Sequence, residues 1–81
     1  MSQSTPGWEL FHQIAQQESA EVRRRLMELG LMEAVGLRNV SFESHRLALE
    51  SRGGSQTPAL WDGQRLHVGR EAVLQRLSRP G

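Results

Sequence analysis

The sequence contains no cysteine and no lysine, and it has no long hydrophobic segment. Without cysteine the chain cannot form a disulfide, a thiolate nucleophile or a cysteine metal site, so packing alone must stabilise its fold. No apolar run approaches the ~20 residues that a membrane-spanning helix needs, and the polar, uncharged N-terminus is unlike a signal peptide. We therefore expect a cytoplasmic protein with no membrane partner.

The charges of the chain are nearly balanced. Ten basic residues, all of them arginine, face nine acidic ones, which gives a net charge of +1. So small a net charge does not create the positive field that attracts nucleic acid, and we expect no nucleic-acid partner. The all-arginine composition reflects codon usage, or else anion binding, which requires the guanidinium groups to converge in space. No pattern indicates an oligomeric state.

Hydrophobic periodicity predicts the secondary structure. Alternating apolar residues are typical of strands, whereas apolar residues at i, i+4 and i+7 are typical of helices. Strands are predicted at 8–14, 37–42, 59–61 and 65–68. Helices are predicted from 18 to a stop at Gly30, from an N-cap at Ser44 to Gly53-Gly54, and over 70–78. Phe11 indicates that the first strand is buried on both faces, and Leu66 and Val68 are expected to point inward.

The order β-α-β-α-β-β-α predicts an α/β fold. A parallel pair of strands joined by a right-handed helical crossover, followed by a hairpin at Asp62-Gly63 and a closing helix, gives a four-stranded mixed sheet with helices on both faces. A chain of 81 residues has room for one domain. We place that domain at 8–78, between a flexible tail at 1–7 and a short C-terminal tail at 79–81.

Three segments carry a family resemblance. The first leads from Glu9-Leu10-Phe11-His12 into the helix at 22–31, the second has Thr57-Pro58 at the mouth of a strand, and the third has Gly69 between the last strand and the last helix. In their order and spacing, over 8–78, these segments resemble the glutaredoxin branch of the thioredoxin fold. They are also similar to the N-terminal domain of glutathione S-transferases.

In that family a Cys-x-x-Cys motif lies at a helix N-terminus, where the helix dipole stabilises a thiolate. The resemblance places Gln16 at the position of the nucleophilic cysteine and Ser19 at that of the resolving one. Thiol–disulfide exchange requires a thiolate, which glutamine cannot supply, so this chemistry is excluded. By resemblance to the transferases, Ser19 is a hydroxyl that stabilises the thiolate of glutathione; otherwise it is a helix cap or a solvent-facing residue.

The resemblance also implies a cis peptide bond at Thr57-Pro58, facing the Gln16 loop, with the backbone of Thr57 pairing with a bound peptide or glutathione. The alternative is a trans proline that opens the third strand. The carboxylate end of glutathione would lie at Gly69-Arg70, because free N–H groups at a helix N-terminus bind anions. Three roles are open for Arg70: it binds that carboxylate, it blocks the position that glutathione takes in the family, or it forms an exposed charged pair with Glu71.

These features predict a redox-inactive, glutaredoxin-like domain that acts as a binding or interaction module for glutathione, a peptide or another protein. The expected ligand-binding residues are Gln16, Ser19, Thr57, Pro58, Gly69 and Arg70. No cofactor is expected, unless glutathione serves as one. His12, His45 and His67 lack the spacing of metal ligands, so no metal site is expected. The alternative is a glutathione-dependent, transferase-like enzyme that uses Ser19 as a hydroxyl donor.

Overall fold

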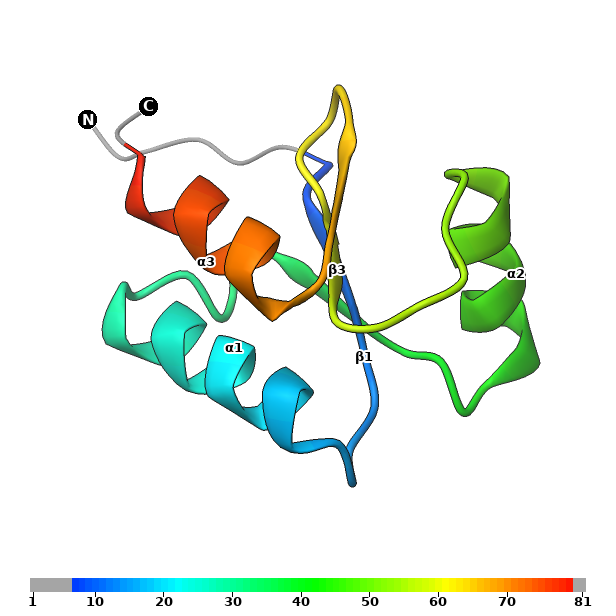
Figure 1. The fold of residues 1–81 in the computed structure, drawn as a ribbon, viewed down its shortest axis with the longest axis horizontal. Helices are drawn as coiled ribbons and strands as arrows, with labels where there is room; N and C mark the ends of the chain where they lie inside the picture. The colour runs from blue at the N-terminus through cyan, green and yellow to red at the C-terminus, as the bar shows by residue number, and fades with distance from the viewer. Residues whose placement is uncertain (1–6, 80–81) are drawn as a thin grey trace.

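The computed structural model describes residues 7–79 and shows a sheet between a pair of helices and a third helix (Figure 1). Its elements are β1 (Glu9–His12), α1 (Gln17–Glu28), β2 (Gly36–Asn39), α2 (Glu43–Ser51), β3 (Ala59–Trp61), β4 (Leu66–Val68) and α3 (Arg70–Ser78). The predicted order of elements is confirmed. The expected tails at 1–7 and 79–81 lie outside the described residues, apart from Gly7 and Arg79.

The strands form one four-stranded mixed sheet in the order β2-β1-β3-β4. β1 is parallel to β2, with Leu10 opposite Leu37, and antiparallel to β3, with Leu10 opposite Leu60. β3 and β4 form an antiparallel hairpin, at whose turn the Asp62 N–H donates to the Arg65 carbonyl oxygen over 3.2 Å. β1 and β3 are therefore the central strands.

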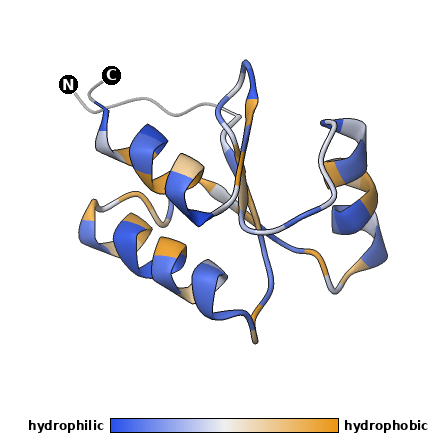
Figure 2. Cartoon of the chain, in the orientation of Figure 1, coloured by the Kyte–Doolittle hydropathy of each residue, from blue (hydrophilic) through white to orange (hydrophobic). Residues whose placement is uncertain are grey.

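The two faces of the sheet carry separate hydrophobic cores, because successive residues of a strand point to opposite faces. On one face Leu10 and Leu60 pack under α1 and α3, and on the other Phe11 and Ala59 pack under α2. Leu10 and Phe11 are both 0% exposed, which confirms that β1 is covered on both faces. Figure 2 shows hydrophilic and hydrophobic residues alternating along the helices, as expected for helices with one buried side.

α1 forms where Val22 and Leu26 stand one turn apart, and both are fully buried. Glu18 lies in the first turn, where a negative charge interacts favourably with the positive end of the helix dipole. Gly30 has a φ of +73°, a left-handed conformation that glycine adopts most easily, and the predicted stop there is confirmed. None of the helices within residues 7–79 has the length and apolar character that crossing a membrane requires.

The start of α2 differs from the prediction. The helix begins at Glu43, and Phe42 rather than Ser44 holds the N-cap position, without a side-chain hydrogen bond. Asn39 causes this difference: its side-chain oxygen accepts the Ser41 N–H over 2.9 Å, and its carbonyl oxygen accepts the Phe42 N–H over 3.1 Å. The resulting turn ends β2 and starts the helix earlier.

β1 and β2 are also shorter than the predicted strands at 8–14 and 37–42. Beyond them the chain leaves the sheet, and Ile14 and Phe42 are 63% and 61% exposed. Arg23 of α1 donates to the carbonyl oxygens of Gln13 and Ile14, which holds this segment away from the strand. The inward placement of Val68 is wrong: it is 41% exposed, because β4 is an edge strand and α2 packs on β1 and β2.

Candidate functional site

The structure brings together the three segments that the sequence singles out. The side chain of Gln16, just before α1, hydrogen-bonds to Thr57. The Gly69 N–H donates to the Pro58 carbonyl oxygen over 2.8 Å. Arg70, the first residue of α3, reaches back to α1. The predicted site residues therefore form one connected region, which we name the α1–β3–α3 junction.

The peptide bond between Thr57 and Pro58 is cis, and this prediction is confirmed. Pro58 is fully buried directly before β3. Opposite it, between β4 and α3, Gly69 has a φ of +97°, a conformation that residues with a Cβ rarely adopt. A proline and a glycine therefore shape the two chain segments that meet at this end of the β3–β4 hairpin.

The Gln16 carboxamide lies at the centre of the junction. Its Nε2 donates to the Thr57 carbonyl oxygen over 2.9 Å. Its Oε1 accepts one hydrogen bond from the Thr57 hydroxyl, over 2.9 Å, and another from the Ser19 hydroxyl. One neutral side chain therefore ties the start of α1 to the residue that precedes the cis proline.

Ser19 lies in the first turn of α1 and is 0% exposed. Besides donating to Gln16, its Oγ accepts the Gln13 N–H over 3.1 Å. Gln16, not Ser19, holds the N-cap position, so the expectation of a capping or solvent-facing serine is wrong. The hydroxyl is buried because it links the loop after β1 to the helix, and a substrate has no direct access to it.

Arg70 forms a charged pair across the junction. Its Nη1 lies 2.9 Å from the Glu21 carboxylate on α1, and its Nη2 lies 3.9 Å from Glu71. The side chain is 42% exposed. Of the three interpretations of Arg70, the structure confirms the exposed charged pair with Glu71 and adds a closer partner on α1. An exposed ion pair of this kind contributes little stability, so its main effect is to occupy the guanidinium.

The described arginines do not converge on one surface. Six of them pair with acidic side chains at five places: Arg25 with Glu28, Arg38 and Arg52 with Glu9, Arg46 with Glu43 and Glu50, Arg70 with Glu21, and Arg76 with Asp62. Two of them also stack on the tryptophans, Arg52 on Trp61 and Arg76 on Trp8. Each of these six arginines therefore has an acidic neighbour within the protein.

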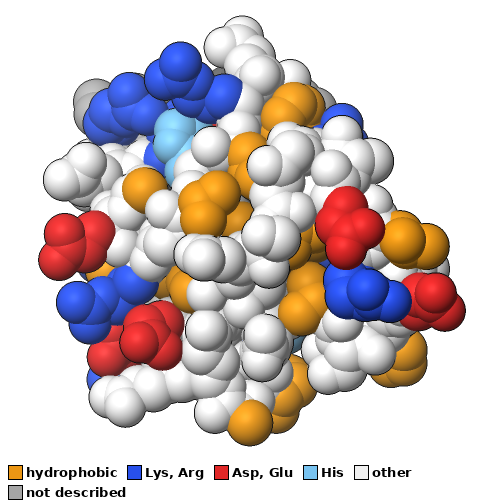
Figure 3. Space-filling model, turned by 45° about the vertical axis from the view of Figure 1, so that its right-hand side comes forward, with side chains coloured by type: hydrophobic (Ala, Val, Ile, Leu, Met, Phe, Trp, Pro, Cys, Tyr) orange, Lys and Arg blue, Asp and Glu red, His pale blue; other side chains and the backbone are white. Residues whose placement is uncertain are grey.

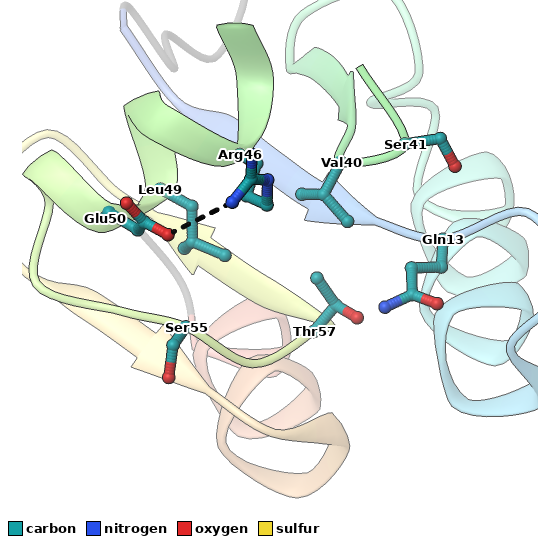
Figure 4. A pocket seen from close by; sticks show the side chains of 8 residues that line it. All are labelled: Gln13, Val40, Ser41, Arg46, Leu49, Glu50, Ser55 and Thr57. Carbon is teal, nitrogen blue, oxygen red and sulfur yellow. Dashed lines mark ion pairs between the residues drawn. The ribbon is translucent and has the colours of Figure 1, made fainter. Parts of the chain in front are cut away.

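A pocket of about 330 Å³ lies next to the junction, between the sheet and α2 (Figure 4). Its lining residues are Gln13, Val40, Ser41, Arg46, Leu49, Glu50, Ser55 and Thr57. Among the predicted site residues, Thr57 alone lines it. The pocket and the junction therefore meet at Thr57.

The pocket combines aliphatic walls with two polar groups that make no hydrogen bond among residues 7–79. Val40 and Leu49 supply the aliphatic surface. The Arg46 guanidinium lies 3.7 Å from Glu43 and 3.8 Å from Glu50, distances too long for hydrogen bonds. The Thr57 N–H has no hydrogen-bond partner among residues 7–79. Figure 3 shows the α2 side of the molecule, where acidic and basic side chains lie side by side.

The sequence contains no direct signal for this pocket. Arg46 and Glu50 resemble residues of a solvated helix face, Leu49 a core residue, and Gln13 and Ser41 loop residues. They line one cavity because parallel β1 and β2 end at the same edge of the sheet and α2 packs across both strands. The rule that ligands bind at the carboxyl ends of parallel strands is the one signal that could have indicated this place.

His12 is bound within a buried polar cluster. It is 4% exposed, and the Arg23 guanidinium donates to its Nδ1 over 2.9 Å. Burial lowers the pKa of His12, and the nearby charges of Arg23 and His45 lower it further. The neutral imidazole therefore serves as an acceptor for Arg23 at the end of β1.

A second polar cluster surrounds Asp62 at the β3–β4 turn. His67 Nε2 and Arg76 Nε lie 2.8 Å and 3.0 Å from its carboxylate. Burial by itself would raise the pKa of Asp62, but hydrogen bonds from the Arg65 and Gln64 N–H groups, His67 and Arg76 hold that pKa well below its usual range. Within the described part of the chain, no three metal-ligating side chains are grouped to hold an ion.

Comparisons with protein-family models, with curated proteins and with solved structures find no match for this chain.

Proposed function

We propose that this chain is a redox-inactive, glutaredoxin-like domain of the thioredoxin fold, and that it binds a peptide-like ligand in the pocket beside the α1–β3–α3 junction. The ligand class includes glutathione, short peptides and segments of a partner protein. The observation that carries the proposal is the position of the pocket: it shares Thr57 with the cis Thr57-Pro58 bond.

The arrangement of the chain supports the family part of the proposal. A parallel pair, β1 and β2, is joined by the crossover helix α1, and an antiparallel hairpin and a closing helix follow. A cis proline lies beside the start of α1, and a glycine precedes the last helix. These features agree with the sequence segments on which the resemblance depends.

The residues at the former thiol positions support binding rather than catalysis. Gln16 has no nucleophile, and its carboxamide is engaged with Thr57 and Ser19. The Ser19 hydroxyl is fully buried, so it cannot contact the sulfur of glutathione without a rearrangement of the Gln16 loop. This observation disfavours the transferase-like alternative.

The lining of the pocket supports a peptide-like ligand. Its volume of about 330 Å³ lies at the lower end of the range for small-molecule sites. The Arg46 guanidinium can bind a carboxylate through paired N–H groups, and the Thr57 N–H can donate to a carbonyl oxygen. Val40 and Leu49 can cover a short aliphatic portion between these polar ends.

A titration with glutathione tests the proposal. We expect binding that weakens roughly tenfold in Arg46→Gln, because a hydrogen-bonded charge contributes about 1.5–3 kcal/mol. Arg25→Gln is the matched control, since Arg25 also pairs with a glutamate three residues away but lies on α1, outside the pocket. Its affinity should equal that of the unmodified protein. The absence of binding at millimolar glutathione, or an equal loss in both variants, would contradict the proposal.

A further inference from the structure

Gln16 engages two of the three hydrogen-bonding groups of Thr57, which is itself a lining residue of the pocket. Its carbonyl oxygen accepts the Gln16 amide, and its hydroxyl proton is donated to the Gln16 Oε1. Its N–H has no partner among residues 7–79. Backbone donors and acceptors both require partners when they are buried. Toward a ligand, the Thr57 backbone therefore offers a donor, whereas its acceptor is already engaged.

The orientation of the Gln16 carboxamide is fixed by its partners. A carbonyl oxygen can only accept, so the Thr57 carbonyl must face the NH₂ side of the amide. Ser19 reinforces this orientation, because its hydroxyl accepts the Gln13 N–H and directs its proton to the Gln16 Oε1. Gln16 itself does not line the pocket. It acts on the pocket from the α1 side, through Thr57.

Arg46, like the Thr57 backbone, supplies a hydrogen-bond donor rather than an acceptor. A guanidinium can only donate hydrogen bonds, and Arg46 makes none with its acidic neighbours, which lie 3.7 Å and 3.8 Å away. Glu50 is the one carboxylate in the lining, and half of its side chain is exposed at the rim. Thr57 and Arg46 both line the pocket, and the groups of theirs that make no hydrogen bond among residues 7–79, a backbone N–H and a guanidinium, are donors.

We propose that Gln16 is a specificity-determining residue: by engaging the Thr57 carbonyl, it makes the pocket select ligands that bring a carboxylate or carbonyl acceptor over matched ligands that bring an N–H donor. The proposal rests on the proposed function and names the ligand class of the same pocket. A ligand N–H that binds the Thr57 carbonyl must share it with the Gln16 amide, which already uses one of its two lone pairs, whereas an acceptor meets the N–H without competition.

The test compares two peptides that differ in one group, N-acetyl-Ala-Ala with a free C-terminal carboxylate and the same peptide with a C-terminal amide. The unmodified protein should bind the carboxylate form more tightly. In Gln16→Ala the ratio of the two affinities should fall roughly fivefold, the equivalent of one neutral hydrogen bond, because the Thr57 carbonyl becomes available to the amide. Arg46 favours the carboxylate in both proteins, so the change in the ratio isolates Gln16.

Gln17→Ala is the matched control, because Gln17 is the next residue, is exposed, and is not the glutamine that hydrogen-bonds to Thr57. Its affinity ratio should equal that of the unmodified protein. If Gln16→Ala retains the preference of the unmodified protein, the role of Gln16 is contradicted while the pocket remains a binding site. If neither the peptides nor glutathione bind to any of the proteins, the proposed function itself fails.

A measurement on the unmodified, ligand-free protein keeps the proposal testable even if Gln16→Ala does not fold. The Gln16 side-chain NH₂ protons should exchange with solvent more slowly than those of Gln75, an exposed glutamine on α3. Addition of the carboxylate peptide should leave this protection unchanged, because the ligand does not compete for the Thr57 carbonyl. Equal exchange rates for Gln16 and Gln75, or loss of the protection when the carboxylate peptide binds, would overturn the proposal.

Discussion

The two faces of the sheet are covered to different degrees. Two helices, α1 and α3, cover one face, whose core includes eight buried residues, whereas the core under α2 includes three. The polar groups near α1 are paired with one another through Gln16, Ser19 and Arg70. Near α2, the Arg46 guanidinium and the Thr57 N–H make no hydrogen bond among residues 7–79. The difference indicates that the α1–α3 face holds the larger core and the paired polar groups, whereas the α2 face holds the pocket and donors without hydrogen bonds.

The largest expected effect concerns the two cores. Leu26 and Leu49 are both buried, at 0% and 2% exposed, but Leu49 also lines the pocket. Leu26→Ala should lower the free energy of unfolding by about 3–4 kcal/mol, because it leaves a closed cavity. Leu49→Ala should lower it by only about 2 kcal/mol, because it widens a pocket that water already reaches. Urea denaturation measures both, and equal losses would contradict the comparison.

A smaller effect is expected from the polar groups on each side. Gln16→Ala should lower the free energy of unfolding by about 1–2 kcal/mol, because it leaves the Thr57 carbonyl without its partner. Arg46→Ala should change it by less than about 0.5 kcal/mol, because the Arg46 ion pairs are long and exposed. Thermal denaturation of the two variants measures both changes. If Arg46→Ala loses more free energy of unfolding than Gln16→Ala, the polar groups of the α2 face rather than those near α1 stabilise the fold, and the comparison of the two faces is wrong.

The smallest effect is a pH dependence from His12. Because the pKa of His12 is lowered in the folded state, the unfolded chain takes up the proton more readily, starting near its ordinary value of 6.5. The contribution of His12 to the free energy of unfolding is therefore fully present above pH 6.5, and it decreases as the pH falls below 6.5. In His12→Asn, whose side-chain oxygen can still accept from Arg23, this part of the decrease should be absent.

Urea titrations at a series of pH values measure the His12 effect. The titrations must be compared at pH values above 3.8, the ordinary pKa of an aspartate. Because the pKa of Asp62 is lowered in the folded state, its contribution to the free energy of unfolding decreases only as the pH falls below 3.8. The same loss of stability just below pH 6.5 in His12→Asn and in the unmodified protein would show that His12 is not its source.

The sequence predicts the features that depend on local pattern. Alternation and helical spacing predict the seven elements in the right order, the mixed sheet and the burial of β1 on both faces. The resemblance predicts the cis bond at Thr57-Pro58 and the position of Gln16 beside it. Each of these features is encoded within a short segment, or by a motif whose spacing is recognisable.

The features that the sequence does not predict depend on contacts between distant segments. The true ends of β1 and β2 depend on Arg23 and Asn39, whose hydrogen bonds turn the chain away from the sheet. The pocket depends on how far a single helix, α2, extends over a four-stranded sheet. The burial of Ser19 depends on Gln16. Periodicity identifies which residues are apolar, but it does not show which loops and side chains will meet.

The most direct test of a ligand site on the α2 face is a map of amide chemical-shift changes during a glutathione titration of the unmodified protein. We expect the changes to gather at Gln13, Ser41, Ser55 and Thr57, which come from three separate loops around the pocket. The exposed residues Met27 and Gln75, on α1 and α3, should not respond. Changes that gather on α1 and α3, with none around the pocket, would contradict the account.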